Sequence, residues 1–194
     1  MSPVELARKL QDSLPGLLRE QSEFRGEISL EVLDPESITK VCQTARQTLG
    51  FDFLLDLSSV DRYGEDPRWL IVYELSGIDH GQHIRLKTLV SEEKSELPSV
   101  SSVWSTANWH EREVFDMMGI RFRGHPDLRR ILMWEGYPYY PLRKDFPLAG
   151  KDSDTPDVAF TRSAPMEGGP FVTVPTAGDA TAREPQARTP RSDD

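Results

Sequence analysis

Side chains able to do acid-base or metal chemistry gather between residues 108 and 145. His110 and Glu111 begin like the pattern His-Glu-x-x-His, in which two histidines one helical turn apart bind zinc and the glutamate acts as a base. Position 114 is Val114, so a helix here would offer one imidazole where that motif needs two. A freestanding metal-dependent hydrolase that uses His110, Glu111, Glu113 and His125 is therefore a remote alternative.

Two other reactive patterns have simpler explanations. His80 and His83 could bind a metal as a loop pair, but no third ligand of clear spacing stands nearby, and a solvated hairpin turn explains them. Cys42 is the only cysteine in 194 residues and lies in an apolar helical stripe, which predicts a buried thiol that packs as a small hydrophobe. A single cysteine excludes an internal disulfide and any iron-sulfur cluster held by four thiolates of this chain.

Arginine and aromatic residues alternate along a backbone that glycine and proline interrupt. The basic side chains are Arg121, Arg123, Arg129, Arg130, Arg143 and Lys144, and the aromatic ones are Trp134, Tyr137, Tyr139, Tyr140 and Phe146. Because arginine pairs with carboxylates in two places at once and lies over aromatic rings, this composition is typical of interface anchors. An internal salt-bridge network that holds the segment against the rest of the fold is the alternative, and both can be true.

The elements that must position these side chains alternate between helices and strands. Ser2-Pro3 with Glu5 three residues after the serine is a helix start. Apolar spacing predicts a second helix from Asp34-Pro35 to Leu49, ended by Gly50. Period-two alternation predicts strands at 27–33, 51–60, 68–75 and 83–90.

A last helix should carry Glu111, Arg112, Glu113 and Asp116, with Asn108 as its N-cap and Gly119 as its end. Helix, strand and helix followed by a meander of strands is typical of an α+β two-layer sandwich. We therefore expect a mixed β-sheet with helices on one face.

The chain should form an α+β domain over residues 1–149 and a tail over residues 150–194. After Leu148 there is no leucine or isoleucine, and proline is frequent. Such a tail cannot bury enough apolar surface to offset the entropy of ordering it. We expect an extended or disordered proline-rich C-terminal arm.

Charge and hydropathy exclude several functions. The formal net charge of −9 opposes binding of nucleic acid or anionic lipid through bulk charge. The N-terminal residues lack the apolar core of a secretory signal, and no apolar run approaches the roughly 20 residues that span a bilayer. We expect a cytoplasmic protein that associates with a membrane only through a partner.

Two blocks in this region resemble a known family. The first joins residues 111–120, E-R-E-V-F-D-M-M-G-I, to residues 124–132, G-H-P-D-L-R-R-I-L, and the second is residues 141–148, P-L-R-K-D-F-P-L. Their content and order resemble the signature of the C subunit, or 30 kDa subunit, of the proton-pumping NADH:quinone oxidoreductase, respiratory complex I. One departure lies between the blocks, where many members have W-E-G-H-P directly before L-R-K-D. Here residues 134–141 are W-E-G-Y-P-Y-Y-P.

The resemblance implies a cofactor-free structural subunit of the hydrophilic arm, on the cytoplasmic side of the inner membrane. It implies packing against the D subunit (49 kDa type, quinone site) and proximity to the B and I subunits, with FMN and the iron-sulfur clusters in partner subunits. No residue of this chain would be catalytic. A homologous subunit of a membrane-bound hydrogenase or of a ferredoxin-type oxidoreductase stays an open alternative.

The residues that the signature assigns to the family pattern and to a subunit interface all lie between positions 111 and 145. They are Glu111, Arg112, Glu113, Asp116, Gly119, Gly124, His125, Pro126, Arg129, Arg130, Arg143, Lys144 and Asp145.

Overall fold

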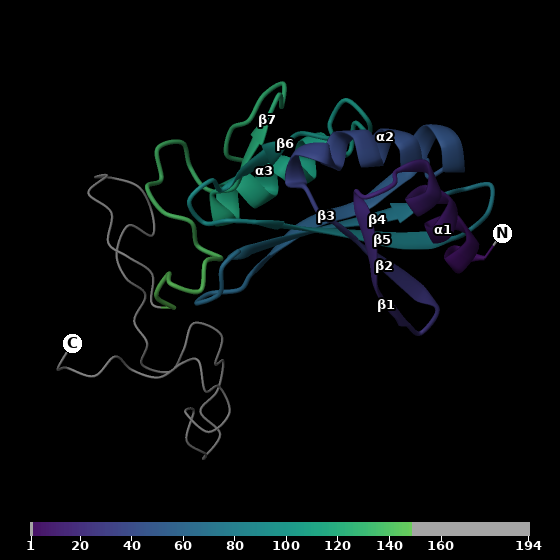
Figure 1. The fold of residues 1–194 in the computed structure, drawn as a ribbon. Helices are drawn as coiled ribbons and strands as arrows, with labels where there is room; N and C mark the ends of the chain where they lie inside the picture. Colours follow the sequence, from purple (N-terminus) through teal and green to yellow (C-terminus); the bar gives the residue numbers. More distant parts are fainter. Residues whose placement is uncertain (1, 149–194) are drawn as a thin grey trace, which may run out of the picture. The chain divides into compact units, whose positions relative to one another are not determined.

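The computed structural model describes residues 2–148 (Figure 1). By its internal contacts the chain divides into two units, Met1–Glu135 and Gly136–Asp194. All the described helices and strands belong to the first unit. The predicted tail, residues 150–194, lies outside the described residues, and the predicted domain boundary at residue 149 stays a prediction.

Helix α1 (Pro3–Ser13) begins where the sequence predicts. The hydroxyl of Ser2 accepts a hydrogen bond from the backbone N–H of Glu5 (3.3 Å), and the Glu5 carboxylate accepts one from the N–H of Ser2 (2.8 Å). This reciprocal pair satisfies two of the N–H groups that a helix start leaves free. The helix buries Leu6 and Leu10 against the rest of the fold.

Strand β1 (Leu18–Phe24) was not predicted, because its sequence L-R-E-Q-S-E-F has no apolar alternation. It pairs with β2 (Glu27–Val32) in an antiparallel hairpin and forms one edge of the sheet. Main-chain hydrogen bonds define this strand, and an edge strand rich in charge is protected from pairing with other chains.

Helix α2 (Ile38–Leu49) follows a short 3-10 turn at Pro35–Ser37. Its buried stripe includes Val41, Cys42 and Ala45, and the thiol of Cys42 is fully buried. Gly50 ends the helix at φ 72, in the left-handed region that glycine enters without strain. The existence of the predicted helix, its end and the burial of Cys42 are confirmed, but its first predicted turn, Pro35–Ser37, is a 3-10 helix.

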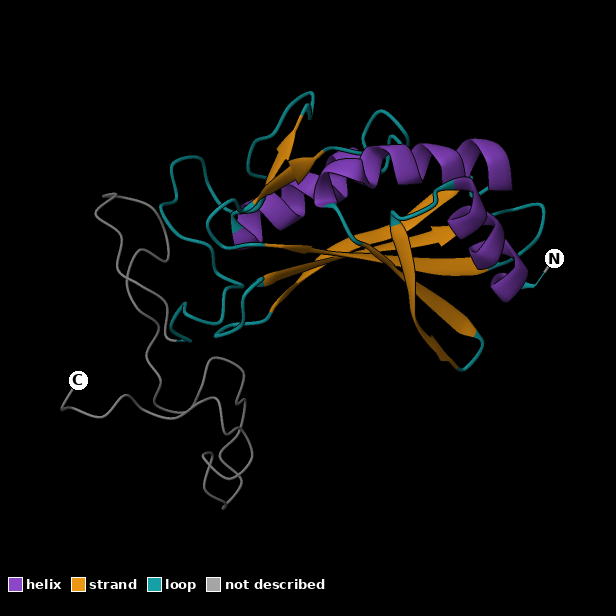
Figure 2. Ribbon diagram, viewed as in Figure 1, coloured by secondary structure: helices purple, strands orange, loops and turns teal. Residues whose placement is uncertain are grey.

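Three strands complete the main sheet: β3 (Phe53–Asp61), β4 (Trp69–Ser76) and β5 (His83–Val90). The strand order is β1-β2-β5-β4-β3, and β2 and β5 are parallel while the other neighbours are antiparallel. The helices lie over one face of this sheet (Figure 2). The predicted α+β fold, with a mixed sheet and helices on one face, is confirmed.

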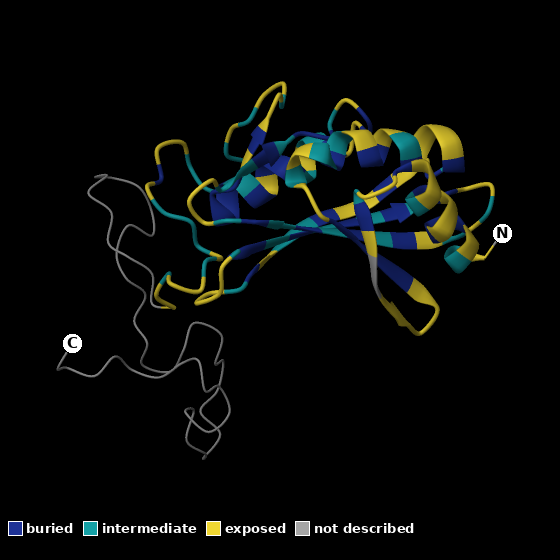
Figure 3. Ribbon diagram, in the orientation of Figure 1, coloured by how far each residue is buried: buried dark blue, intermediate teal, exposed yellow. Residues whose placement is uncertain are grey.

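The core lies between this sheet and its helices (Figure 3). In the interior strand β4, Trp69, Ile71, Tyr73 and Leu75 are buried, and the residues between them are half-buried. This alternation is the period of two that a strand imposes on its side chains. In residues 2–148 no helix is both long and apolar enough to cross a membrane.

Helix α3 (Ala107–Met118) begins two residues earlier than predicted, after Thr106. The prediction that Asn108 caps it is wrong, because Asn108 lies within its first turn, and the Glu111 side chain that would complete a capping box points into the core instead. Two short strands, β6 (Glu96–Pro98) and β7 (Arg121–Arg123), form a separate parallel pair on either side of α3 in the sequence. Three-residue strands give no usable periodicity, so they were not predicted.

Candidate subunit interface

Helix α3 contains the first half of the sequence signature. Some of the signature side chains point into the fold and others point toward solvent. Val114, Met117 and Met118 are buried, as their spacing predicts, and Gly119 ends the helix at φ 76. Glu111, Arg112 and Asp116 are also buried, although all three are charged residue types. Buried charges must be paired or hydrogen-bonded, so the partners of these three side chains define the site.

Glu111 is bonded to the segment that precedes α3. Its carboxylate accepts hydrogen bonds from the hydroxyl of Ser99 and the backbone N–H of Val100, each at 2.6 Å. Burial raises the pKa of Glu111 to about 7, and the bonds from Ser99 and Val100 only partly oppose that rise. The Nε2 atom of His125 lies 4.0 Å from the same carboxylate.

Asp116 is bonded to the segment that follows α3. One carboxylate oxygen accepts three consecutive backbone N–H groups, from Ile131 (3.0 Å), Leu132 (2.7 Å) and Met133 (2.9 Å), and the other accepts from the Arg130 guanidinium at 2.6 Å. Burial acts to raise the pKa of Asp116, but these donors outweigh it and hold the pKa below its ordinary value. The charged form of Asp116 therefore organises the backbone of residues 130–133.

Arg112 reaches the same segment from the preceding turn of α3. Its guanidinium donates to the carbonyl oxygens of Arg129 (3.1 Å) and Arg130 (3.3 Å) and lies over the ring of Trp109, 5.1 Å from its centroid. Arg112 and Asp116 thus fix residues 129–133 from two positions on one helix. We call α3 together with residues 119–135 the α3 platform.

His125 connects the segment that follows α3 to the first turn of that helix. Its Nε2 bonds to the carbonyl oxygen of Asn108 at 3.1 Å, and its Nδ1 accepts the N–H of Asp127 at 3.0 Å, so the proton lies on Nε2. Both ring nitrogens are therefore engaged within the fold. Gly124, at φ 78, and the exposed Pro126 form the bend that brings His125 back to α3.

The four residues of the metal-hydrolase alternative do not converge. His110 lies 3.5 Å from the carboxylate of Asp56, whereas Glu111 and His125 bond to separate backbone groups and Glu113 is exposed. Within residues 2–148, no three metal-ligating side chains are grouped closely enough to hold an ion. The His80 and His83 pair also separates, since His80 bonds to the carbonyl of Leu49 and His83 is exposed.

The outer surface of the platform carries the remaining signature residues of the first unit. Arg129 and Glu113 are exposed, and Arg129 pairs with its neighbour Asp127 at 2.9 Å. Trp109 is also 63% exposed, although it is held by Arg112. Trp109 was not among the predicted site residues. Its position on α3 opposite the buried apolar residues Val114, Met117 and Met118 is the signal that could have indicated it.

The arginine-rich segment was explained either as an internal network or as interface anchors, and each explanation applies to some of its residues. Arg112 and Arg130 belong to the internal network, since their guanidinium groups bond within the first unit. Exposed Arg129 is available at the surface of the α3 platform. The internal network therefore holds in place the surface on which the exposed residues lie.

The second signature block belongs to the unit Gly136–Asp194. There the Arg143 guanidinium lies over the Tyr140 ring at 4.5 Å, and the Tyr139 ring contacts those of Tyr137 (5.7 Å) and Phe146 (6.0 Å). Lys144 and Asp145 are exposed. The residues that depart from the family pattern, 137–141, thus supply an aromatic cluster.

Comparisons with known proteins agree with this geometry. A family model described as "Respiratory-chain NADH dehydrogenase, 30 Kd subunit" matches residues 32–152. The C subunit of the NADH-quinone oxidoreductase of Geotalea uraniireducens is 40% identical over 146 residues, which cover 75% of this chain and 88% of that protein. The corresponding C subunit of Roseiflexus castenholzii is 46% identical over 162 residues, which cover 82% of this chain and 89% of that protein.

Solved structures share the fold. A trypsin-resistant fragment of Nqo5 has a TM-score of 0.56 and 30% identity, over 63% of this chain and 98% of the fragment. A chain of the membrane-bound sulfane sulfur reductase, an archaeal respiratory membrane complex, has a TM-score of 0.65 and 21% identity, over 75% of this chain and 85% of that one. At that identity the second likeness shows the fold alone. The match to the family model, the relatives and the fold together establish that this chain belongs to the family of the 30 kDa subunit of respiratory-chain NADH dehydrogenase.

Proposed function

We propose that this chain is a cofactor-free structural subunit of the hydrophilic arm of a proton-translocating NADH:quinone oxidoreductase. The assembly would pass electrons from NADH through FMN and iron-sulfur centres to quinone and couple this to proton translocation. In this proposal the chain contributes a scaffold, and it has no catalytic activity by itself.

The α3 platform is the observation that carries the proposal. Its buried acids and arginines bond to one another and to backbone, which fixes an irregular segment rigidly against a helix. A rigid surface loses little conformational entropy when a partner binds. It also presents an exposed tryptophan, Trp109, and an exposed arginine, Arg129, two residue types enriched among the strongest contacts of protein interfaces.

The partner of this surface would be the D subunit, of the 49 kDa quinone-site type, with the B and I subunits nearby. The family supports a place in such a complex, because the relatives are named as C subunits of NADH-quinone oxidoreductase. Arg143, Lys144 and Asp145, which complete the signature, would supply further contacts to the assembly from the second unit. The chain would sit peripherally on the cytoplasmic side of the inner membrane, held there through the complex.

The cofactors would reside in partner subunits. A single buried cysteine cannot supply the ligands of an iron-sulfur cluster, which supports a redox-silent role beside the electron-carrying subunits. A homologous role in a related membrane-bound hydrogenase or ferredoxin-type oxidoreductase is the second candidate. An archaeal respiratory membrane complex contains a chain of the same fold, which is the observation behind this second candidate. The electron-input subunits that co-purify with the chain would distinguish the two candidate functions.

Charge reversal at the exposed arginine tests the interface. Arg129→Glu should leave the isolated chain folded, with a free energy of unfolding within about 0.5 kcal/mol of wild type, as for other surface substitutions. In cells that carry a tagged chain, it should strongly reduce recovery of the D subunit with the tag. Native gels and quantitative mass spectrometry of the purified complex measure that recovery.

Arg8→Glu is the matched control, because Arg8 is exposed on α1 and lies outside both the signature and the α3 platform. It should leave recovery of the D subunit unchanged. Normal assembly of both variants would show that the α3 platform does not bind the D subunit. Recovery of the wild-type chain from cell extract as a solitary, stable protein would contradict the whole proposal.

A further inference from the structure

The face of the sheet away from the helices carries an organised surface that the α3 platform does not use. On β4, Leu70 and Val72 alternate with residues buried under the helices, so their side chains face the opposite way. The register places Val60 of β3 opposite Leu70, and Leu70 opposite Leu89 of β5. Within the described part of the first unit, this face has no covering helix (Figure 2).

Four apolar residues continue across the strands on this face. Leu33, directly after β2, stands beside Leu89, since Val32 pairs with Thr88 in the parallel register. Leu33 is 49% exposed and Val60 is 46% exposed, at the two ends of the row. We call Leu33, Leu89, Leu70 and Val60 the apolar stripe, and at about 4.8 Å between strands it crosses about 15 Å of sheet.

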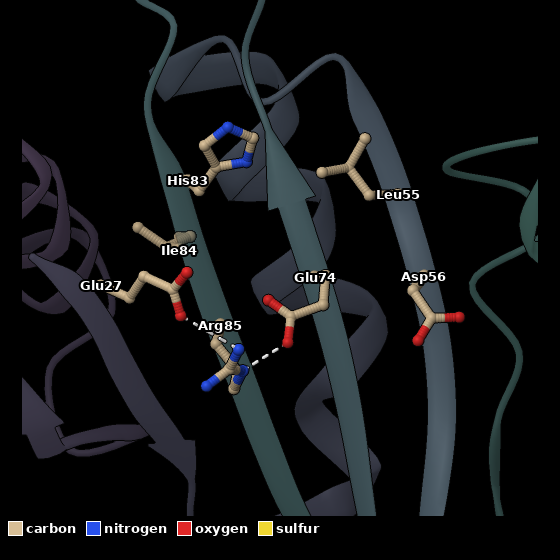
Figure 4. A pocket seen from close by; sticks show the side chains of 7 residues that line it. All are labelled: Glu27, Leu55, Asp56, Glu74, His83, Ile84 and Arg85. Carbon is tan, nitrogen blue, oxygen red and sulfur yellow. Dashed lines mark hydrogen bonds and ion pairs between the residues drawn. The ribbon is translucent and has the colours of Figure 1, made fainter. Parts of the chain in front are cut away.

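A charged hollow of about 250 Å³ lies on the same face, toward the other end of the strands (Figure 4). Its polar lining is Glu27, Asp56, Glu74, His83 and Arg85. Arg85 bonds to Glu74 and lies 3.2 Å from Glu27. The lining holds three carboxylates against one guanidinium, so the hollow keeps an excess of negative charge. The third carboxylate, that of Asp56, lies 3.5 Å from His110 and not against Arg85.

We propose that this face is a second interface, occupied by another polypeptide of the assembly that lays apolar side chains on the stripe and places a lysine or arginine in the hollow. The charge excess selects a cation, and the stripe supplies the apolar contact area that a lone surface charge pair lacks. A second copy of this chain would bring an equally acidic hollow, so the occupant is a different polypeptide. The proposal rests on the chain being a subunit of a larger complex.

The sheet geometry also fixes the spacing that the occupant needs. Glu74 in the hollow and Leu70 in the stripe are four residues apart on β4, which is about 13 Å at 3.3 Å per residue. The occupant's cation and its apolar contact must be separated by the same distance. That is about four residues of an extended segment or about nine residues of a helix.

Site-specific photo-crosslinking in the intact, membrane-extracted complex tests the occupant. A benzophenone amino acid at position 33 or 60 should crosslink to one and the same other subunit, through a peptide that contains lysine or arginine. Position 78 is the control, because Ile78 is 67% exposed in the β4–β5 loop, outside this face. Crosslinks only to residues 149–194 of this chain, only to a second copy, or to nothing would overturn the proposal.

A crosslinker at position 109 separates this inference from the proposed function. If position 109 crosslinks to another subunit while positions 33 and 60 do not, only the second interface is wrong. If none of the three crosslinks to another subunit, the role as a structural subunit fails as well.

Charge neutralisation tests the hollow independently. The double variant Glu27→Gln and Asp56→Asn should lower recovery of the crosslinked subunit about tenfold at low salt, where exposed charge pairs are least screened. The control Glu23→Gln and Asp52→Asn removes the same charge from exposed positions that do not line the hollow, and it should keep wild-type recovery. Equal recovery of both double variants would show that no cation of a partner enters the hollow.

Discussion

The substitution Glu111→Gln should change how the stability of this protein depends on pH. Glu111 is fully buried, and burial raises its pKa to about 7. In the unfolded chain the pKa of a glutamate returns to its ordinary value of about 4.3. Glutamine has the same shape and can keep a carbonyl oxygen facing the N–H of Val100, but it cannot ionise.

The sign follows from which state binds the proton. Below about pH 4.3 the glutamate is protonated in both the folded and the unfolded chain. Between that pH and about 7 only the folded chain keeps the proton, so stability falls as the pH rises. Above about pH 7 both states are ionised, and the stabilisation from this group is gone. At about 1.4 kcal/mol for each of the roughly 2.7 pH units between the two pKa values, the full loss is about 4 kcal/mol, of which about 3 kcal/mol falls between pH 4.5 and 8.

Urea unfolding of the purified full-length chain between pH 4.5 and 8 measures this difference. The Glu111→Gln chain should gain about 3 kcal/mol of unfolding free energy relative to wild type between those limits. The comparison removes the opposite contribution of Asp116, whose lowered pKa stabilises the fold at higher pH and loses that effect in acid. Glu113→Gln is the control, because Glu113 is exposed on the same helix.

Parallel stability curves for wild type and Glu111→Gln would refute the reasoning. They would mean that the carboxylate ionises as easily inside the fold as in the unfolded chain. A curve for Glu113→Gln that differs from wild type as strongly as that of Glu111→Gln would also refute it, because the effect would then belong to the charge of the helix and not to the buried site. His125, whose Nε2 lies 4.0 Å from Glu111, is unchanged in both variants.

Two further substitutions test the packing. Asp116→Asn should lower the free energy of unfolding by about 3 to 5 kcal/mol, because it removes the buried negative charge that pairs with the Arg130 guanidinium. Trypsin should then cleave faster after Arg130. An unchanged urea midpoint would contradict this. Gly77→Ala should cost about 1 to 3 kcal/mol, because a Cβ there would collide with the Gly50 carbonyl oxygen and the His80 ring. If His80→Ala fully restores the stability of Gly77→Ala, the backbone of Gly50 is not the obstacle.

Helix α2 and strands β4 and β5 could be predicted from the sequence because each repeats its own pattern. The α2 stripe recurs at helical spacing and ends at Gly50, and β4 and β5 alternate buried and half-buried residues along their length. Such periodicity is local, so it is visible without knowing the neighbours. Strand β1 and the β6-β7 pair have no such pattern. Backbone pairing defines them, with the neighbouring strand β2 for β1 and across helix α3 for β6 and β7.

The signature residues could also be found in the sequence, but their roles could not be assigned there. Arg129 and Arg130 are adjacent and of the same type, so residue type alone predicts the same role for both. In the structure, Arg130 bonds to the buried Asp116, and Arg129 faces outward beside Asp127. Trp109 was missed because its exposure depends on which side of α3 meets the sheet.

The sequence by itself determined the family, the α+β class and the position of the charged segment, because these depend on local spacing and on residue types in order. Only the tertiary structure decided which charges are buried. Glu111 is bonded to Val100, 11 residues away, and Asp116 to Met133, 17 residues away, and such pairs form only when helix α3 is packed. A charged side chain can be buried only where the packed chain supplies its partners. Burial therefore distinguishes the charged residues of the internal network from the exposed residues that are able to contact a partner.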